Sequence, residues 1–326
     1  MTTFTMRNYR DQADYWRIRD FLRQVFLLND RRELSWPVTR FDFDYWYWYG
    51  PENLKLGRLD QDLFIWETAD QRMPAVRMYA SALNREGPGN AFFQVHPVLG
   101  THGLVEEMLA VAESRLAVPG PDGRPALTVW AHEHDHLLQE ALAGRGYARS
   151  GEPPEAHHRR PFSVPIPDAP IPEGYTVRAL GDVEELQAKS RVVRSAFYPG
   201  DPDEASGEWT RLGHLQRAPL YRRDLDMVAV APGGEFAAFC TVWFDDVTRT
   251  GAFEPVGVAP VHRRRGLGRA LICEGLRRLE RLGATVGCAP ALAIVCSESP
   301  AAYALYTSVG FTEVDLVEPW VKPDAS

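Results

Sequence analysis

Short apolar or alternating segments recur along the second half of the chain, and turn residues separate them. Tyr175–Leu180 alternates as a half-buried strand does, and Ala252–Val258 follows as a further strand. Met227–Ala231 and Glu235–Phe244 flank a Pro-Gly-Gly turn, which predicts a hairpin. Ala291–Cys296 is apolar throughout, which is typical of a strand in a sheet that is covered on both faces.

Helical patterns lie between these strands. Asp182 is a candidate cap for a helix that runs to about Phe197, and a polar loop with a short helix is expected over residues 199–225. A longer helix is predicted from about Gly266 to Leu282, since its apolar residues form one stripe. A short helix follows over Ala301–Val309, and a last strand starts near Phe311.

The first half of the chain repeats this plan weakly. Three pairs of landmarks share an offset of 163 or 164 residues: Pro97 with Pro260, Gly103 with Gly266, and Gly146 with Gly310. Half of the 326-residue chain is 163, so the offset indicates an internal duplication. Two unrelated α/β domains with chance matches are the alternative.

A proline-rich stretch near the midpoint separates the two halves. Residues 161–172 hold five prolines and no helical pattern, so they are predicted to form a stiff, extended linker. The predicted organisation is a first domain over residues 1–160, the linker over 161–172 and a second domain over 173–326.

Composition and charge exclude several classes of protein. The hydrophobic share of 45% and charged share of 25% are ordinary for a globular protein, and no apolar run is long enough for a membrane helix. The net charge of −8 argues against a nucleic-acid partner and is compatible with a cationic substrate, although plain solubility explains it as well. Four cysteines without a CxxC, and no visible signal peptide, predict a reduced, cytoplasmic protein.

The strongest chemical feature is a basic glycine loop between a predicted strand and a helix. It reads Arg263-Arg-Arg-Gly266-Leu-Gly268-Arg269. Glycines there let backbone N–H groups approach a ligand, and the helix N-terminus adds partial positive charge, so the loop suits a phosphate or pyrophosphate. The spacing fits neither a Walker loop nor a Rossmann fingerprint.

Two motifs in this half resemble those of the GNAT N-acetyltransferase superfamily. Arg263-x-x-Gly266-x-Gly268 is similar to its R/Q-x-x-G-x-G/A signature. About forty residues on, the stretch from Ser299 to Phe311 resembles its N-x-x-A-x-x-L-Y-x-x-x-G-F motif. The resemblance covers roughly residues 173–320. It implies an α/β fold of mixed α+β sheet type, with two tandem GNAT-like domains. Each domain would be a mostly antiparallel sheet, flanked by helices and splayed at a bulged strand.

The resemblance also implies acetyl-CoA as co-substrate, no metal, and a set of site residues. The implied cofactor-binding residues are Val256, Gly257, Val258, Arg263, Arg264, Arg265, Gly266, Leu267, Gly268, Arg269, Ala270, Ser299 and Ala302. The loop backbone would hold the pyrophosphate, and the strand backbone at Val256 and Val258 would pair with the pantetheine arm and polarise the thioester carbonyl. Tyr306 would protonate the departing thiolate, a role that a phenol with a pKa of about 10 fills without tuning.

Three residues depart from simple expectations. Pro255 lies inside an apparent strand, so an edge or a bulge is expected there. Glu254 shares a strand face with Val256 and is the candidate general base, acting through water; it lies two residues from the family's usual position, where this chain has Ala252. A strand carboxylate paired with an arginine is the alternative. Ser299 replaces the family's asparagine, and its hydroxyl can still bond the pantetheine arm.

The first domain resembles the same fold without its chemistry. Gly100 and Val105 replace the first arginine and second glycine of the signature, and Leu142 stands in the place of Tyr306. This domain is therefore predicted to be a degenerate, non-catalytic copy that helps to close a substrate cleft. Its motif His132-Glu-His134-Asp-His136 looks like a metal site, but no distant ligand is evident in the sequence.

The predicted reaction is direct acetyl transfer from acetyl-CoA to a primary amine within a ternary complex. Small cationic amines, including aminoglycoside-like compounds, and a cysteinyl or pseudodisaccharide amine remain open as acceptors. No nucleic-acid or membrane partner is expected, and a monomer or a homodimer fits equally. The alternative function is a non-catalytic acyl-CoA binding or sensing protein, which would have no need of Tyr306.

Overall fold

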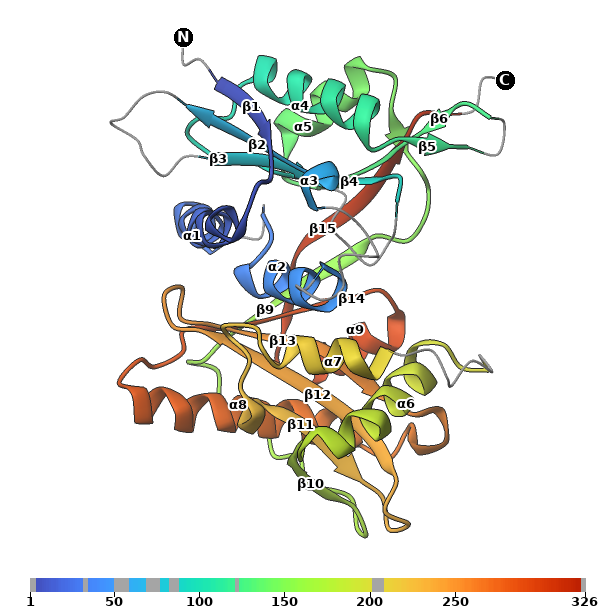
Figure 1. The fold of residues 1–326 in the computed structure, drawn as a ribbon. Coiled ribbons are helices and arrows are strands. Elements are labelled where there is room, and N and C mark those ends of the chain that lie inside the picture. Colours follow the sequence, from blue (N-terminus) through green and yellow to red (C-terminus); the bar gives the residue numbers. More distant parts are fainter. Residues whose placement is uncertain are drawn as a thin grey trace. The chain divides into compact units, whose positions relative to one another are not determined.

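The computed structural model describes residues 4–31, 35–49, 59–68, 77–81, 88–120, 123–200 and 208–323. The chain divides into two compact units. The first comprises Met1–Ala156 together with Asp315–Ser326, and the second comprises His157–Val314 (Figure 1). Part of the predicted loop over 199–225, residues 201–207, lies outside the described residues.

The first unit contains a mixed sheet with the strand order β1-β2-β3-β4-β7-β15, and β8 also pairs with β15. Its strands are β1 Phe4–Asn8, β2 Leu63–Thr68, β3 Arg77–Ser81, β4 Asn90–Gln94, β7 Thr128–His132, β8 Ala148–Arg149 and the later part of β15 Thr312–Val321. Described neighbours pair antiparallel except β4 with β7, which run parallel. A separate ribbon joins β5 Val118–Pro119 to β6 Pro125–Ala126.

The helices of the first unit are α1 Gln12–Leu28, α2 Val38–Asp44, α3 Leu59–Asp62, α4 His102–Arg115 and α5 His136–Gly144. One core cluster lies between the sheet and α4 and α5, where Leu104, Leu109, Val129 and Leu142 are buried. After α2, the aromatic run Tyr45–Tyr49 forms a π-helical turn. This run packs on α1, with Tyr45 and Tyr15 ring centroids 4.2 Å apart.

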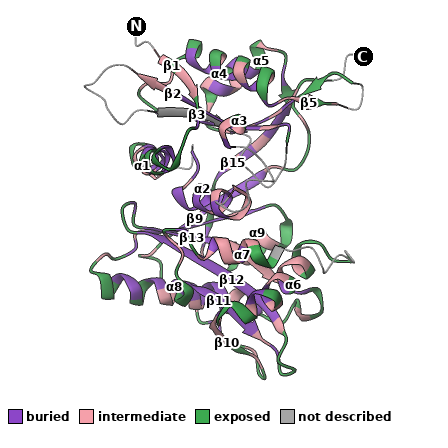
Figure 2. Cartoon of the chain, in the orientation of Figure 1, coloured by how far each residue is buried: buried purple, intermediate pink, exposed green. Residues whose placement is uncertain are grey.

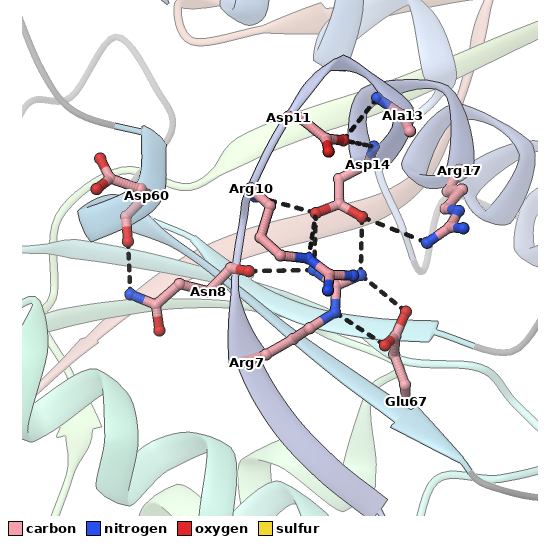
Figure 3. A network of polar contacts seen from close by, with 9 residues as sticks. All are labelled: Arg7, Asn8, Arg10, Asp11, Ala13, Asp14, Arg17, Asp60 and Glu67. Atoms are coloured by element: carbon pink, nitrogen blue, oxygen red, sulfur yellow. Dashed lines mark hydrogen bonds and ion pairs between the residues drawn. The ribbon is translucent and has the colours of Figure 1, made fainter.

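An ion-pair network joins β1, α1 and β2 in the first unit (Figure 3). Arg7 donates two hydrogen bonds of 2.7 Å to Asp14 and two of 2.8 Å to Glu67. Asp11 caps α1 by accepting from the amides of Ala13 and Asp14. Burial alone would raise the pKa of Asp14, but the hydrogen bonds from Arg7 and from the Arg10 amide, together with the charges of both arginines, outweigh it and hold that pKa below its ordinary value.

The second unit has the strand order β9-β14-β13-β12-β11-β10. Its strands are β9 Glu155–Pro161, β10 Thr176–Ala179, β11 Asp226–Val230, β12 Phe236–Asp245, β13 Thr250–Val258 and β14 Leu292–Ser297. Residues 155 and 156 of β9 belong to the first unit. The pairs from β10 to β13 are antiparallel, whereas β13 and β14 run parallel.

The helices of the second unit are α6 Leu186–Phe197, α7 Glu208–Leu215, α8 Leu267–Val286 and α9 Pro300–Ser308, with 3-10 turns at Val183–Glu185, Arg223–Leu225 and Pro260–His262. The apolar stripe of α8 packs on one face of the sheet against Cys240 and Val242. Phe239 points to the other face, where α6 covers it through Phe197. Burial is therefore greatest along the central strands (Figure 2).

The two units share one plan. In each, an antiparallel meander leads into a strand, a helix, a parallel neighbouring strand and a short helix: β4-α4-β7-α5 in the first and β13-α8-β14-α9 in the second. The predicted fold class, two tandem mixed α/β units, is confirmed.

The edges of the units differ from the predicted ranges. The predicted linker lies within the second unit, because Phe162, Ile166 and Ala169 pack against that unit's core. The last strand begins in the second unit, but from Asp315 onward it belongs to the first. The second unit therefore contains most of β9, and the first unit contains the later part of β15, although each lies mainly in the range predicted for the other unit.

Candidate active site

A bulge interrupts the pairing of β12 with β13. Cys240 pairs with Val256 and Val242 pairs with Phe253, so β13 carries one extra residue opposite Thr241. The extra residue falls at Glu254–Pro255, whose peptide bond is cis. Trp243 Nε1 donates to the Glu254 carbonyl at 2.6 Å and supports the bulge. The expectation of a bulge at Pro255 is confirmed.

Beyond the bulge, β13 parts from its parallel neighbour. The two strands pair only from Thr250–Leu292 to Ala252–Ile294, although β13 continues to Val258 and β14 to Ser297. The amide of Ala259 donates to the Ala237 carbonyl. In an antiparallel ladder, every second residue of β13 counted back from Ala259 therefore directs its N–H and C=O groups toward β12. The N–H and C=O groups of Val256 and Val258 therefore lie on the other edge of β13. Arg263 donates to the Val258 carbonyl on that edge, and the Val256 groups and the Val258 amide there face no described strand, so they can meet another extended chain.

The loop before α8 presents unpaired backbone donors. Arg264 and Gly266 have positive φ values of 63° and 87°, and Gly266 occupies the N-cap of α8 without a side-chain cap. Within the described part of the chain, the six consecutive amides of residues 264–269 have no hydrogen-bond acceptor, and the next amide, of Ala270, bonds to Gly266. Donors at a helix N-terminus favour an anion.

The side chains of the loop divide into two groups. Arg264, Arg265 and Arg269 themselves belong to the run of unpaired amides; the first two are exposed and Arg269 is half-buried. Arg263 instead donates to the carbonyls of Val258 at 3.1 Å and Ala196 at 2.9 Å. Its guanidinium thus ties the loop to β13 and α6.

At several residues predicted to bind the cofactor, the side chain, or its absence in a glycine, serves packing within the second unit. Leu267 and Ala270 are buried in the core of the second unit. A Cβ on Gly268 would lie 2.9 Å from Leu305, and one on Gly257 would lie 2.4 Å from Phe239. These two glycines let α8 approach α9 and let β13 approach the Phe239 ring, so only the backbone of these positions is left to meet a ligand.

Helix α9 holds the predicted acid. Ser299 caps the helix by accepting from the Ala302 amide at 3.3 Å, which leaves its hydroxyl proton for another acceptor. Tyr306 is 5% exposed, and its hydroxyl makes no hydrogen bond to any described residue. Burial raises the pKa of Tyr306 well above its ordinary value, and nearby groups that include Glu254 raise it further. The phenol therefore stays protonated at neutral pH.

Glu254 lies within electrostatic reach of Tyr306. It sits at the bulge, partly buried, on the strand whose open edge follows it. The structure thus brings the candidate base, the candidate acid and the open strand edge into one region of the second unit.

Sequence reasoning missed two residues of this region, His158 and Arg160 on β9. The His158 ring packs 4.9 Å from Tyr303 and 5.9 Å from Tyr306, and its Nε2 lies 2.8 Å from Ser297 Oγ. Arg160 is fully buried and donates to the Val309 carbonyl at the end of α9. Polar residues in a stretch with no apolar alternation gave no signal of a buried strand.

Comparisons with known proteins show the family of this chain. The family model described as acetyltransferase (GNAT) family matches residues 191–311. A mycothiol acetyltransferase from Nocardioides sp. is 30% identical over 239 residues, which cover 68% of this chain and 76% of that protein. A mycothiol acetyltransferase from Salinispora arenicola is 32% identical over 224 residues, or 67% of each chain.

Solved structures with the same fold extend over the whole chain. A tandem GNAT protein from the clavulanic acid biosynthesis pathway superposes with a TM-score of 0.65 at 15% identity, covering 100% of both chains. A GCN5-related N-acetyltransferase from Sphaerobacter thermophilus gives a TM-score of 0.62 at 19% identity, covering 98% of this chain and 95% of that one.

Fold, site and relatives together define an acyltransferase of two tandem units. The chain belongs to the GNAT acetyltransferase family. Among its described helices, none combines the length and apolar character that a bilayer crossing requires.

Proposed function

We propose that the second unit transfers an acetyl group from acetyl-CoA to a primary amine by direct attack in a ternary complex. The observation that carries this proposal is the run of unpaired amides at residues 264–269, next to the open edge of β13. An anion at the loop and an extended amide-bearing arm along the strand are what this pair of features would bind. The pyrophosphate and pantetheine of a coenzyme A thioester have that chemistry.

In the proposed complex each part of the cofactor has a partner. The loop amides and the charges of Arg264, Arg265 and Arg269 hold the pyrophosphate. The open edge at Val256 and Val258 pairs with the pantetheine arm, and one of its N–H groups hydrogen-bonds the thioester carbonyl. Holding both reactants together supplies much of the rate, because attack becomes effectively intramolecular.

In the proposed reaction the acceptor nitrogen gives up two protons, and each has a defined destination. The acceptor enters as an ammonium ion, and Glu254 takes one proton through water to give the neutral amine. The amine nitrogen attacks the thioester carbon and forms a tetrahedral oxyanion. As this intermediate collapses, the C–S bond breaks and Tyr306 protonates the thiolate. The second proton from nitrogen returns to the tyrosinate through solvent. The products are an amide, the free thiol and one proton.

The acceptor is proposed as a primary amine of the mycothiol type, a cysteinylated pseudodisaccharide. Its support is the printed name of the relatives, mycothiol acetyltransferase, at 30% and 32% identity. A small cationic amine is the second candidate, since the chain carries a net charge of −8. The first unit is proposed to be non-catalytic, because Leu142 stands where the second unit has Tyr306.

Thiol release from acetyl-CoA with a panel of amines tests these proposals. The panel holds a cysteinylated pseudodisaccharide amine, an aminoglycoside and short polyamines. We expect at least one amine to raise thiol release far above the hydrolysis rate. Binding of acetyl-CoA without amine-dependent thiol release from any panel member would count against this reaction and favour a sensing role. Activity with only the polyamines would reject the mycothiol-type acceptor alone.

A further inference from the structure

The histidine-rich motif of the first unit meets a distant carboxylate. His132 ends β7, and Glu133 and His134 form the turn before α5. Strand β15 pairs with β7, and the Glu133 amide donates to the Leu316 carbonyl at 2.8 Å. These backbone bonds bring Asp315, far away in sequence, to the turn. Asp315 is thus the distant ligand that was not evident from the sequence motif.

Both imidazoles face the Asp315 carboxylate. His132 Nδ1 lies 2.7 Å from one carboxylate oxygen, and His134 Nδ1 lies 3.2 Å from the other. Glu133 Oε1 lies 3.5 Å from the same His134 nitrogen. Ligand atoms of Glu133, His134 and Asp315 all fall within 4.8 Å of one another, so a single ion can reach all three after small rotations.

The charge around the cluster favours a cation. Glu133 and Asp315 place two carboxylates close together, both beside the same His134 ring nitrogen. A divalent ion between them would offset both negative charges. Asp315 is buried and bonded to His132 and to the Leu316 amide, so it is held in place. His134 is half exposed, which gives an ion a way in.

We propose that Glu133, His134 and Asp315 bind a divalent transition metal ion, with Zn²⁺ as the best fit. One imidazole nitrogen and two carboxylate oxygens suit Zn²⁺, and water completes a tetrahedral set. His132 is the residue that orients the Asp315 ligand through its hydrogen bond. The site is structural: it fastens β15 to the turn between β7 and α5, where the last segment of the chain joins the first unit.

Zinc binding to the untagged, full-length protein tests the proposal. The protein is stripped with a chelator and equilibrated with Zn²⁺, and bound zinc is measured by elemental analysis and by calorimetry. We expect one zinc ion per chain with a sub-micromolar Kd. His134→Gln and Glu133→Gln, both at partly exposed positions, should each weaken binding at least tenfold. His102→Gln removes an exposed histidine elsewhere in the first unit and should leave the Kd unchanged.

Two outcomes would overturn the site. One is equal zinc binding by the unaltered protein and His134→Gln, which would place the ion elsewhere, for example at a cysteine. The other is no zinc retained above background by the unaltered protein. Circular dichroism checks that both variants are folded. Zinc should also raise the Tm of the unaltered protein and of His102→Gln, but not that of His134→Gln.

Discussion

The two strand–loop–helix junctions of this molecule share a plan but differ in their unpaired donors. In the first unit Thr101 caps α4 by accepting from the Leu104 amide, and the amides of Leu99 and Gly100 bond to the His96 carbonyl. Among the described residues this leaves a run of three amides, 101–103, without an acceptor. The second junction leaves six, 264–269, and three of these six residues are arginines. The same fold thus favours a strong anion site at only one junction.

The strands that precede the two loops also differ, and again the feature that suits a ligand is found in the second unit. The described pairing of β4 with β3 shows no register shift, whereas β13 bulges at Glu254–Pro255. At the following short helix, Leu142 fills the core of the first unit and Tyr306 takes the matching place in the second. A duplicated backbone is therefore insufficient for the proposed chemistry, which rests on a bulge, an uncapped loop and one phenol.

The phenol is expected to give the largest effect. Tyr306→Phe removes the proposed acid with little change in packing, so kcat should fall by about 100-fold or more, while acetyl-CoA binding changes little. Steady-state thiol release and calorimetry measure the two. Tyr303→Phe, a neighbour on α9 that is 40% exposed, is the matched control and should keep kcat within about twofold. Equal activities of the two variants would remove Tyr306 from the reaction.

The pH dependence sharpens this prediction. Burial raises the pKa of Tyr306 above its ordinary value, so the protonated, donating form persists to higher pH than for an exposed tyrosine. We expect no loss of kcat from tyrosine ionisation up to about pH 10. A basic limb near pH 8 that vanishes in Tyr306→Phe would contradict the assigned environment.

The arginines of the loop come next. The double substitution Arg264→Ala and Arg265→Ala keeps the backbone donors and removes two charges, so the Kd for acetyl-CoA should rise by about 10- to 100-fold. The salt dependence of binding should weaken as well. Arg115→Ala, at an exposed arginine of the first unit, should leave the Kd unchanged. An unchanged Kd in the double variant would mean that the amides alone hold the ligand.

The second unit was largely predictable because its elements carry local signals. The predicted strand Ala291–Cys296 is β14 shifted by one residue, and the predicted helix Gly266–Leu282 is α8, extended to Val286. The glycine loop and Tyr306 stand out because their residue types are tied to fixed spacing. The bulge was also readable, since proline cannot donate within a ladder.

The unit to which β9 and the later part of β15 belong was not predictable. Glu155–Pro161 is a mostly buried strand rich in polar residues, and particular partners satisfy its buried side chains: Ser297 for His158, and backbone carbonyls for Arg160. No periodic pattern encodes such pairing. Likewise, the alternation of β15 predicts a strand but carries no information on which sheet it joins. The meeting of Asp315 with His132 and His134 depends on that same long-range pairing.

The candidate base should have a smaller effect than the acid or the loop charges. Glu254→Gln keeps the shape of the bulge and removes the carboxylate, so kcat/KM for the amine should fall by about tenfold at neutral pH. The loss should shrink as pH rises, because a larger share of the amine is already neutral. The pH–rate profile of the variant measures this. A profile identical to that of the unaltered enzyme would leave Glu254 as a structural carboxylate.

The cap of the first junction should give the smallest effect. Thr101→Ala removes the side-chain acceptor for the Leu104 amide and should cost about 1 kcal/mol of stability. Chemical denaturation followed by circular dichroism measures this loss. Acetyl-CoA binding should stay unchanged, because the affected amides belong to a loop that lacks the arginines of the second junction. If Thr101→Ala instead created a second acetyl-CoA site, detectable as a stoichiometry above one, then capping alone would separate the two junctions, and the missing arginines, bulge and phenol would be secondary.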